Sequence, residues 1–266
     1  MLTKAGDLFR QGDLAAAIDA ANAAVRDAPA DSGARVLLAE LLLFVGNYER
    51  ADSVLDAGAT IDPSASLVIS EFRQLLRGEM ARRQVTSEGR MPEFLGQPTA
   101  TQTHLLKAVV MLRNGDADSA AEAVRAAEEE RPVVAGRRDG TEFADFRDAD
   151  DLSTGNFEIL SATGKYFWIP TERVESIEFH PPKRPRDLFW RRCTMMVRDG
   201  PDGDVYLPAL YQAMHREGGA AQSDSLRLGR ATEWTKSEPV CGIGQRIYLA
   251  GDEGLPMQQL TLLEFA

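Results

Sequence analysis

Cysteine and histidine are scarce in this chain, and their scarcity limits the chemistry that can be expected of it. The 266 residues include two cysteines, Cys193 and Cys241, and three histidines, His104, His180 and His215. Neither cysteine has CxxC or CxH spacing, so no structural zinc site is expected. Lone thiols are typical of a reducing compartment. We therefore expect no bound metal and a cytoplasmic location.

Long apolar runs and familiar catalytic motifs are also missing. The longest apolar run, residues 36–46, contains Glu40 and is shorter than the roughly 18 residues that a membrane helix needs. The first residues reach charge and glycine before an apolar segment forms, so no signal peptide is expected. There is no P-loop, GxSxG elbow or HExxH helix, and Gly242 and Gly244 lack the rest of a dinucleotide fingerprint. These absences predict no membrane segment, no cofactor and no enzyme activity.

Net positive charge is absent from both halves of the chain. The formal net charge is -11, and residues 1–135 carry 14 Lys/Arg against 20 Asp/Glu. Residues 136–266 carry 16 against 21. Neutralising phosphates requires a basic surface, so no nucleic-acid partner is expected. A hydrophobic content of 44% with 27% charged residues is typical of a folded globular protein.

The first half of the chain contains a repeat. A glycine precedes a proline by 17 residues three times, and small residues recur between them. Glycine permits a sharp turn, alanine lets two helices approach closely, and proline ends the second helix. The first two units are 34 residues apart, which is the period of tetratricopeptide repeats. The markers are Gly12 and Pro29, Gly46 and Pro63, and Gly115 and Pro132, with Ala17, Ala51 and Ala120 in the second helices.

A degenerate unit separates the second repeat from the third. Residues 64–83 predict one helix, and residues 86–98 are a loop rich in glycine and proline. The loop is expected to cap the groove that stacked repeats leave, and such concave surfaces bind peptides or helices. The residues of this helix expected to face the core are Leu67, Phe72, Leu75 and Leu76.

Residues 136–266 change to the two-residue period of β-strands. Hairpins are predicted over residues 157–170 and 193–211, and a strand with an irregular step at Ser176 lies between them. Further strands are expected within residues 225–234, 245–251 and 258–265. The predicted fold class is α+β, with helical repeats over residues 1–135 followed by a mainly β domain over residues 136–266. That domain is expected to be a small curved sheet or a barrel.

Two charged stretches could carry chemistry. The run FRDADD contains Asp148, Asp150 and Asp151, which could hold a divalent cation. Capping of a turn, or pairing with arginines of the basic stretch described next, is favoured over metal binding. The stretch PPKRPRDLFWRR, residues 181–192, has five cations and two aromatics. Structural ion pairing with nearby aspartates, including Asp187, is favoured for it over a protein-docking surface and over nucleic-acid contact. Leu188 and Trp190 in this stretch alternate as in an edge strand with one buried face.

Several phrases, taken in order, resemble one family. FRDADD, YFWIP, PRDLFWRR, RDGPDGDVYLPALY, LRLGRATEW and GIGQRIYLAGDE are followed by LLEF near the end of the sequence. The series is similar to the ImpE family, also called the TagJ or SciE type, accessory proteins of the bacterial type VI secretion system. Residues 212–225 depart from that pattern and are expected to be a mobile insertion. The resemblance transfers no catalytic residues.

The resemblance implies a non-enzymatic, cytoplasmic adaptor. Similar proteins associate with the small subunit of the contractile sheath, and their distribution is linked to the AAA+ unfoldase that recycles sheaths. A helix of the sheath subunit would fit a repeat groove. The candidate groove-rim residues are Arg35, Glu71, Arg73, Lys107 and Arg113.

The β domain offers a second candidate surface, because arginine and tryptophan are frequent among interface hot spots. Trp168, by contrast, is expected in the core. The alternative function is a small-ligand-binding or hydrolytic β domain, which would require Asp148, Asp151, His180 and Arg186 to converge in a pocket. The candidate docking residues of the β domain are Arg186, Trp190, Arg191, Arg227, Arg230 and Trp234.

Overall fold

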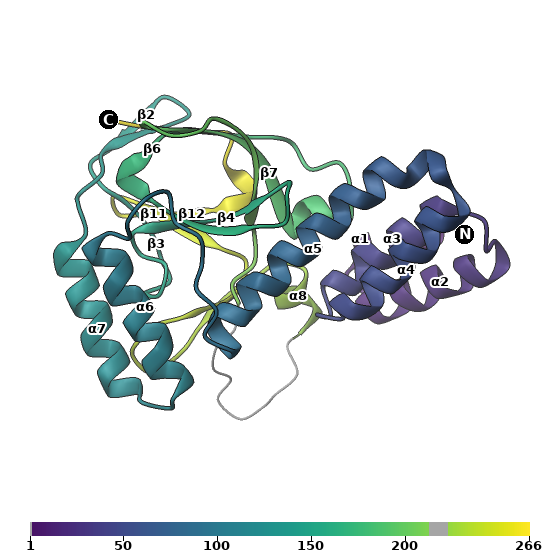
Figure 1. Ribbon diagram of the computed structural model, residues 1–266, viewed down its shortest axis with the longest axis horizontal. Coiled ribbons are helices and arrows are strands. Elements are labelled where there is room, and N and C mark those ends of the chain that lie inside the picture. Colours follow the sequence, from purple (N-terminus) through teal and green to yellow (C-terminus); the bar gives the residue numbers. More distant parts are fainter. Residues whose placement is uncertain (1, 213–222) are drawn as a thin grey trace.

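The computed structural model describes residues 2–212 and 223–266, and Figure 1 shows its two parts. Helices build the N-terminal half and antiparallel strands build the C-terminal half, which confirms the predicted α+β class. Most of the insertion expected at residues 212–225 lies outside the described residues. Within the described ranges, no helix is long and apolar enough to cross a membrane.

The first two repeat units form a helical stack that the next helix extends. Gly12 and Gly46 have φ of 94° and 70° at the turns inside the units, a left-handed conformation that favours glycine. Ala17 and Ala51 are fully buried where the helices meet. The stack consists of α1 (Leu2–Gln11), α2 (Leu14–Asp27), α3 (Ser32–Leu43), α4 (Tyr48–Ile61), a short 3-10 turn η1 (Pro63–Ala65) and α5 (Ser66–Ser87).

The second helix of every repeat unit begins with the same capping bond. Asp13, Asn47 and Asp116 each follow the turn glycine directly, and each accepts a hydrogen bond from a backbone N–H three residues later. This bond satisfies a donor that the first turn of a helix leaves free. The repeat markers therefore define complete helical hairpins, turn and cap included.

The third unit forms the same hairpin but does not stack on α1–α4, although its Leu105 and Val109 share a core cluster with α5. It consists of α6 (Ala100–Arg113) and α7 (Ala117–Glu130), and Figure 1 shows it beside the β region rather than beside α1–α4. Part of its apolar side forms a separate core cluster with Leu152 and Cys241 of the β region. The repeats predicted over residues 1–135 are therefore not one continuous stack.

Two expectations for the degenerate unit are wrong. Leu67 is 80% exposed rather than buried, although Phe72, Leu75 and Leu76 do face the core. The loop after α5 does not cap a groove. Its Glu93 forms a parallel bridge with strand β5 (Tyr166–Pro170), donating to Tyr166 O at 2.9 Å and accepting from Trp168 N at 3.0 Å. The loop thus covers part of an otherwise open sheet edge.

The main sheet has eight antiparallel strands in the order β2-β1-β13-β6-β7-β8-β4-β5, and it is not closed into a barrel. Both predicted hairpins are present, and the irregular step at Ser176 is a register shift in β6. Strand β7 is central rather than an edge strand. The other bounds are β1 (Gly136–Arg138), β2 (Thr141–Phe143), β4 (Asn156–Ser161), β6 (Val174–Phe179), β7 (Trp190–Val197), β8 (Gly203–Pro208) and β13 (Leu262–Phe265).

Two small sheets complete the β region. Part of the strand expected over residues 225–234 is instead a short helix, α8 (Asp224–Arg227). Aromatic rings of Phe146, Phe157, Tyr248 and Phe265 pack between the main sheet and the three-stranded sheet, with centroids 5.2–6.0 Å apart. The small sheets contain β3 (Phe146–Asp148), β11 (Ile247–Ala250) and β12 (Glu253–Pro256), and β9 (Thr232–Trp234) with β10 (Gly242–Gly244). The remaining 3-10 turns are η2 (Thr171–Arg173), η3 (Pro185–Leu188) and η5 (Met257–Gln259).

Candidate functional site at the junction of repeats and sheet

The β region covers the face of the stack that the first helices of the units form. Segment 185–190, comprising η3 and the start of β7, lies against α3 and α5. The Phe189 ring packs at 5.4 Å from Phe44, and the Trp190 ring at 5.9 Å from Phe72. Trp190 is 1% exposed, and its indole N–H donates to Glu79 at 2.9 Å. The groove expected to receive a partner helix is therefore filled by the chain itself.

Arg186 is also buried between the stack and the β region, but its guanidinium group is not fully hydrogen-bonded. Its guanidinium lies over the Phe72 ring at 4.9 Å, and 3.9 Å separates it from carboxylate oxygens of Glu40 and Glu71. Within the described residues, its Nη1 atom and the Oε1 atom of Glu40 are buried without a hydrogen-bond partner. Burial outweighs the attraction of Arg186 and raises the pKa of Glu40 to about 7. This carboxyl group therefore titrates near neutral pH.

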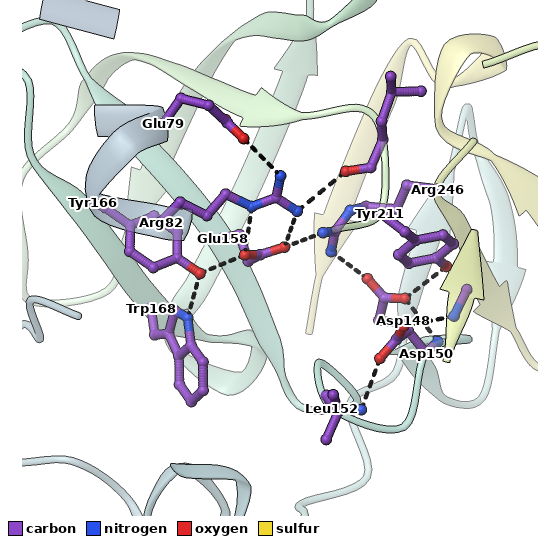
Figure 2. A network of polar contacts seen from close by, with 12 residues as sticks. Glu79, Arg82, Asp148, Asp150, Leu152, Glu158, Tyr166, Trp168, Tyr211 and Arg246 are labelled. Atoms are coloured by element: carbon purple, nitrogen blue, oxygen red, sulfur yellow. Dashed lines mark hydrogen bonds and ion pairs between the residues drawn. The ribbon is translucent and has the colours of Figure 1, made fainter. Parts of the chain in front are cut away.

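A second buried network lies beside this contact and joins α5 to the sheet (Figure 2). The Arg82 guanidinium donates to both oxygens of Glu158 on β4, at 2.8 and 2.9 Å, and to Glu79 at 3.2 Å. Arg246 donates to the same Glu158 carboxylate and, at 2.5 Å, to Asp148 on β3. Burial alone would raise the pKa of Glu158, but the guanidinium groups of Arg82 and Arg246 hold it well below its usual range.

The far end of the network is a tight turn after β3. Asp150 accepts backbone hydrogen bonds from Leu152 at 2.8 Å and from Gly242 at 2.7 Å. Burial, together with the neighbouring Asp148 carboxylate, raises the pKa of Asp150 to about 7. Asp151 accepts a bond from Val240 N at 2.7 Å. The aspartates of FRDADD thus cap turns, as one of the open interpretations predicted. The arginine that Asp148 binds is Arg246, however, and not an arginine of the basic stretch 181–192.

Further polar contacts hold the stack and the β region together at their periphery. Arg230 donates to the backbone oxygens of Phe9 and Arg10, at 2.8 and 2.9 Å, at the end of α1. The carboxylate of Asp224 accepts from Leu14 N, at the start of α2. The Tyr206 hydroxyl donates to Glu71 on α5. The orientation of the stack on the sheet is therefore set by contacts along α1, α2, α3 and α5.

A cavity of about 400 Å³ opens at this junction. The turn between α3 and α4, the middle of α5, the loop after β8 and helix α8 form its walls. Its volume lies in the range of sites that hold small ligands or side chains, roughly 300–1,000 Å³. The lining residues are Leu43, Phe44, Val45, Gly46, Tyr48, Glu79, Arg82, Arg83, Phe189, Leu210, Tyr211, Gln212, Leu226, Arg227 and Gly244.

The predicted docking residues of the β domain do not share one surface. Arg186, Trp190 and Arg191 are buried, which corrects the expectation that they are exposed to a partner. Arg227 is half-buried at the cavity, and Arg230 is tied to α1. Trp234 is 39% exposed, beside the Tyr211 ring.

The predicted groove-rim residues fall into two groups. Arg35, Glu71 and Arg73 belong to the stack, where Arg73 is ion-paired with Asp52 at 2.7 Å and with Asp56. Lys107 and Arg113 are exposed on α6, in the separate third unit. A single rim is therefore not formed.

The convergent pocket required by the hydrolytic alternative is not present. Asp148 binds Arg246, Asp151 binds Val240 N, His180 lies 3.0 Å from Thr194, and Arg186 faces Glu40. These four residues share no contact. Both cysteines are buried, and burial raises the pKa of each thiol, which disfavours the reactive thiolate.

The basic stretch 181–192 is mainly structural. Besides the buried Arg186 and Arg191, Arg192 pairs with Asp204 at 2.5 Å. The Asp187 carboxylate accepts from the backbone N–H groups of Lys183 and Arg184. Ion pairing was the favoured prediction, but the acidic partners are Glu40, Glu71 and Asp204 rather than the aspartates of FRDADD. Trp168 is buried, as expected, and donates to the Tyr166 hydroxyl.

The sequence alone did not indicate the central residues of the junction. Glu79, Arg82, Glu158, Tyr211 and Arg246 come from segments that are distant in the chain. One available signal was Arg246, a lone cation at the start of an otherwise apolar strand, in GIGQRIYLAG. A charge in such a position is rarely buried without a partner.

Comparison with known proteins supports both halves of this description. Residues 140–264 match the family described as ImpE protein, and residues 8–69 match a tetratricopeptide repeat family. The chain is 30% identical, over 98% of its length and 90% of the relative's, to the type VI secretion system accessory component TagJ of Pseudomonas aeruginosa. A crystal structure of a Vibrio parahaemolyticus protein has a TM-score of 0.90 at 25% identity, covering 98% of this chain and 97% of that one.

Proposed function

This chain belongs to the ImpE family, and on that premise we propose that it is a non-enzymatic adaptor of type VI secretion that binds the small subunit of the contractile sheath. A relative similar over nearly the whole chain is an accessory component of that system. Tetratricopeptide repeats bind protein segments rather than perform chemistry. These two observations support an accessory role with protein partners in the cytoplasm.

The surface for the sheath subunit lies outside the usual repeat groove, because segment 185–190 fills the inner face of the stack. The corner between α4 and α5 is the observation that carries the proposal. Ile61 is 43% exposed, Leu67 80% and Val68 40%, and they lie within eight residues of one another. Exposed aliphatic side chains grouped in this way are typical of a protein-binding site.

An amphipathic helix is the segment that this corner fits. Its apolar side chains would pack on Ile61, Leu67 and Val68, and its polar side would remain in water. The side chain of Arg35, on α3, packs against Gly58 near the end of α4. Its Cδ atom lies 3.5 Å from the place that a Cβ atom would take at Gly58. Its guanidinium donates to Pro29 O and can also meet a carboxylate of the partner at the rim.

The link to the sheath-recycling unfoldase is a second element of the proposal. An adaptor needs a surface for each partner, and the β region supplies the other one. Trp234 is exposed there and supported by the Tyr211 ring at 5.7 Å. A supported, exposed tryptophan is a common anchor of interfaces. We assign the unfoldase to this surface of the β region.

Co-purification tests the proposal. The full chain would be mixed separately with the small sheath subunit, the large sheath subunit and the unfoldase from the same genome. We expect stable capture of the small sheath subunit, and loss of capture when its exposed helix is deleted. Leu67→Asp should weaken capture at least about tenfold, because it places a charge in an apolar contact.

A matched control separates this surface from exposed aliphatic residues in general. Val133 is 73% exposed and lies in the connection after α7, so Val133→Asp should leave capture unchanged. Capture of no component at low and moderate salt would contradict the adaptor function. Capture that survives Leu67→Asp would leave the function but reject the α4–α5 corner.

A further inference from the structure

We propose that the cavity at the junction of the stack and the β region is a docking site for an acidic protein segment, one that carries a carboxylate next to an apolar side chain. This site goes beyond the sheath-binding surface and shares no residue with it. Cations and polar groups without partners line this cavity beside apolar side chains.

The lining is basic in an acidic protein. Arg82, Arg83 and Arg227 line the cavity with one carboxylate, that of Glu79. Arg82 is already paired with Glu158, so Arg83 and Arg227 carry the positive charge that is available to a ligand. The whole chain carries -11. Both Glu79 oxygens already accept hydrogen bonds, one from Arg82 and one from Trp190. A concave site with this sign attracts and orients an anionic group.

Arg83 is the cation best placed to bind that group. It is exposed on α5, and within the described residues its guanidinium makes no ion pair or hydrogen bond. Arg227, which lines the cavity from α8, has only a distant contact of 3.7 Å with Asp224. Two exposed arginines outside the cavity, Arg125 and Arg137, have acidic partners at 2.6 and 2.8 Å. Two guanidinium groups, from α5 and α8, are thus available at the cavity.

The lining of the cavity also includes a tyrosine, Tyr48. Tyr48 is half-buried, and its ring packs at 6.4 Å from Phe189. Its hydroxyl group forms no hydrogen bond with any residue that the structure describes. Arg82 is held rigidly behind it by Glu158, Glu79 and Leu210 O. A carboxylate that enters between Arg83 and Arg227 would therefore find a free hydroxyl donor in a preformed site.

The walls explain why a protein segment, rather than a free ion, is the ligand. Phe44, Val45, Leu210 and Leu226 line the cavity beside the cations, and Val45 is 40% exposed at its edge. An apolar side chain next to the bound carboxylate would cover this surface. An inorganic anion or a small carboxylate would leave it in contact with water.

A phage-displayed random dodecapeptide library, selected on the immobilised full chain, tests the inference. We expect enrichment of peptides with Asp or Glu adjacent to Leu, Ile, Val, Met or Phe. The enrichment should disappear with Arg83→Glu, which reverses the free cation. It should persist with Arg77→Glu, a charge reversal on the same helix outside the cavity. Absence of acidic enrichment, or enrichment unaffected by Arg83→Glu, would overturn the proposal.

Isothermal titration then identifies the chemistry of the ligand. The selected peptide should bind the wild-type chain at least about tenfold more tightly than its Glu→Gln counterpart, with a similar loss for Arg83→Glu. Sodium succinate should bind far more weakly than the peptide. Equal affinity for succinate would assign the site to small carboxylates and reject the protein segment. Sheath capture by Arg83→Glu should be normal, so failure here is distinguishable from failure of the adaptor function.

Discussion

The first two repeat units and the third carry the same markers but have different neighbours. Each unit has the glycine turn, the capped second helix and the buried alanine column, with Ala51 and Ala120 both fully buried. Yet α1–α4 stack on one another and on α5, while α6 and α7 pack beside the β region (Figure 1). The repeat pattern therefore determines a hairpin, and what the hairpin packs against is decided elsewhere.

One position shows how the two environments differ. Counted back from the proline of each unit, Glu40 on α3 occupies the same position as Val109 on α6. Val109 is buried among apolar side chains. Glu40 is buried against Arg186 of the β region, without full hydrogen bonding. Where the α1–α5 stack contacts the sheet, it therefore buries a carboxyl group whose hydrogen bonding is incomplete.

Breaking the network beneath α5 should give the largest effect, because it joins the stack to the sheet. Glu158→Ala would leave Arg82 and Arg246 buried without their shared carboxylate, and we expect a loss of about 3–5 kcal/mol in the free energy of unfolding. Denaturant unfolding measures this loss. The control, Glu142→Ala, removes the exposed partner of Arg137 and should cost less than about 1 kcal/mol. Equal effects would mean that the network does not hold the junction.

Titration of Glu40 should sharpen the contrast between the two units. Its pKa is raised in the folded state to about 7, so the folded protein binds its proton more tightly than the unfolded chain. The stability that this group contributes is therefore greatest below about pH 4.5 and is lost as the pH rises through 7. The charged groups that act on it are Arg186, Arg184 and Asp187.

Glu40→Gln provides the test of this titration. The variant should match the wild type near pH 4.5 and exceed its stability by about 3 kcal/mol above pH 8. Unfolding curves measured across this pH range give the difference. Glu49→Gln, on the exposed start of α4, serves as the control and should show no such trend. A constant difference between wild type and Glu40→Gln would show that folding does not shift the pKa of Glu40.

Overpacking the alanine columns tests whether the two kinds of hairpin are equally tight. Ala51→Leu in the stack and Ala120→Leu in the third unit should each cost about 1–3 kcal/mol, because neither site has space for a larger side chain. Thermal unfolding of both variants measures the effect. Unchanged melting in both would mean that the repeat register is wrong. Loss of stability in only one variant would show that the two helices of the other hairpin can move apart to accept the larger side chain.

The smallest effect on stability is expected at the α4–α5 corner. Leu67→Ser removes an exposed side chain with few contacts and should change the free energy of unfolding by less than about 0.5 kcal/mol. Leu76→Ala, on the buried face of the same helix, should cost about 2–5 kcal/mol. A large loss from Leu67→Ser would mean that this corner is covered within the folded chain and is not available to a partner.

Local pattern predicted the elements well and their surroundings poorly. The hairpins, the β-bulge at Ser176 and the change from helices to strands could all be predicted, because turns and periodicity are properties of neighbouring residues. Leu67 and the loop at Glu93 could not, since burial at a helix end and pairing at a sheet edge depend on distant segments. The segment 225–234 was assigned to a strand, although a capped turn at Ser223 begins α8 there.

The candidate sites divide in the same way. The interpretation of PRDLFWRR as structural was possible from sequence because its prolines, cations and aromatics suit a buried turn. Its partners Glu40 and Glu79 are more than 100 residues away and have no signature of their own. The cavity requires the α3–α4 turn, α5 and α8 together. No pattern within one segment could predict this combination of residues.

The sequence by itself determined the repeat hairpins, the alternating strands, the scarcity of reactive groups and the resemblance to a family of accessory proteins. These follow from backbone geometry and side-chain chemistry over short distances. The tertiary structure alone decided that the inner face of the stack is filled, that Arg186 and Trp190 are buried, and that a basic cavity remains open beside them. Burial and charge pairing depend on which distant segments meet, and only the folded chain brings them together.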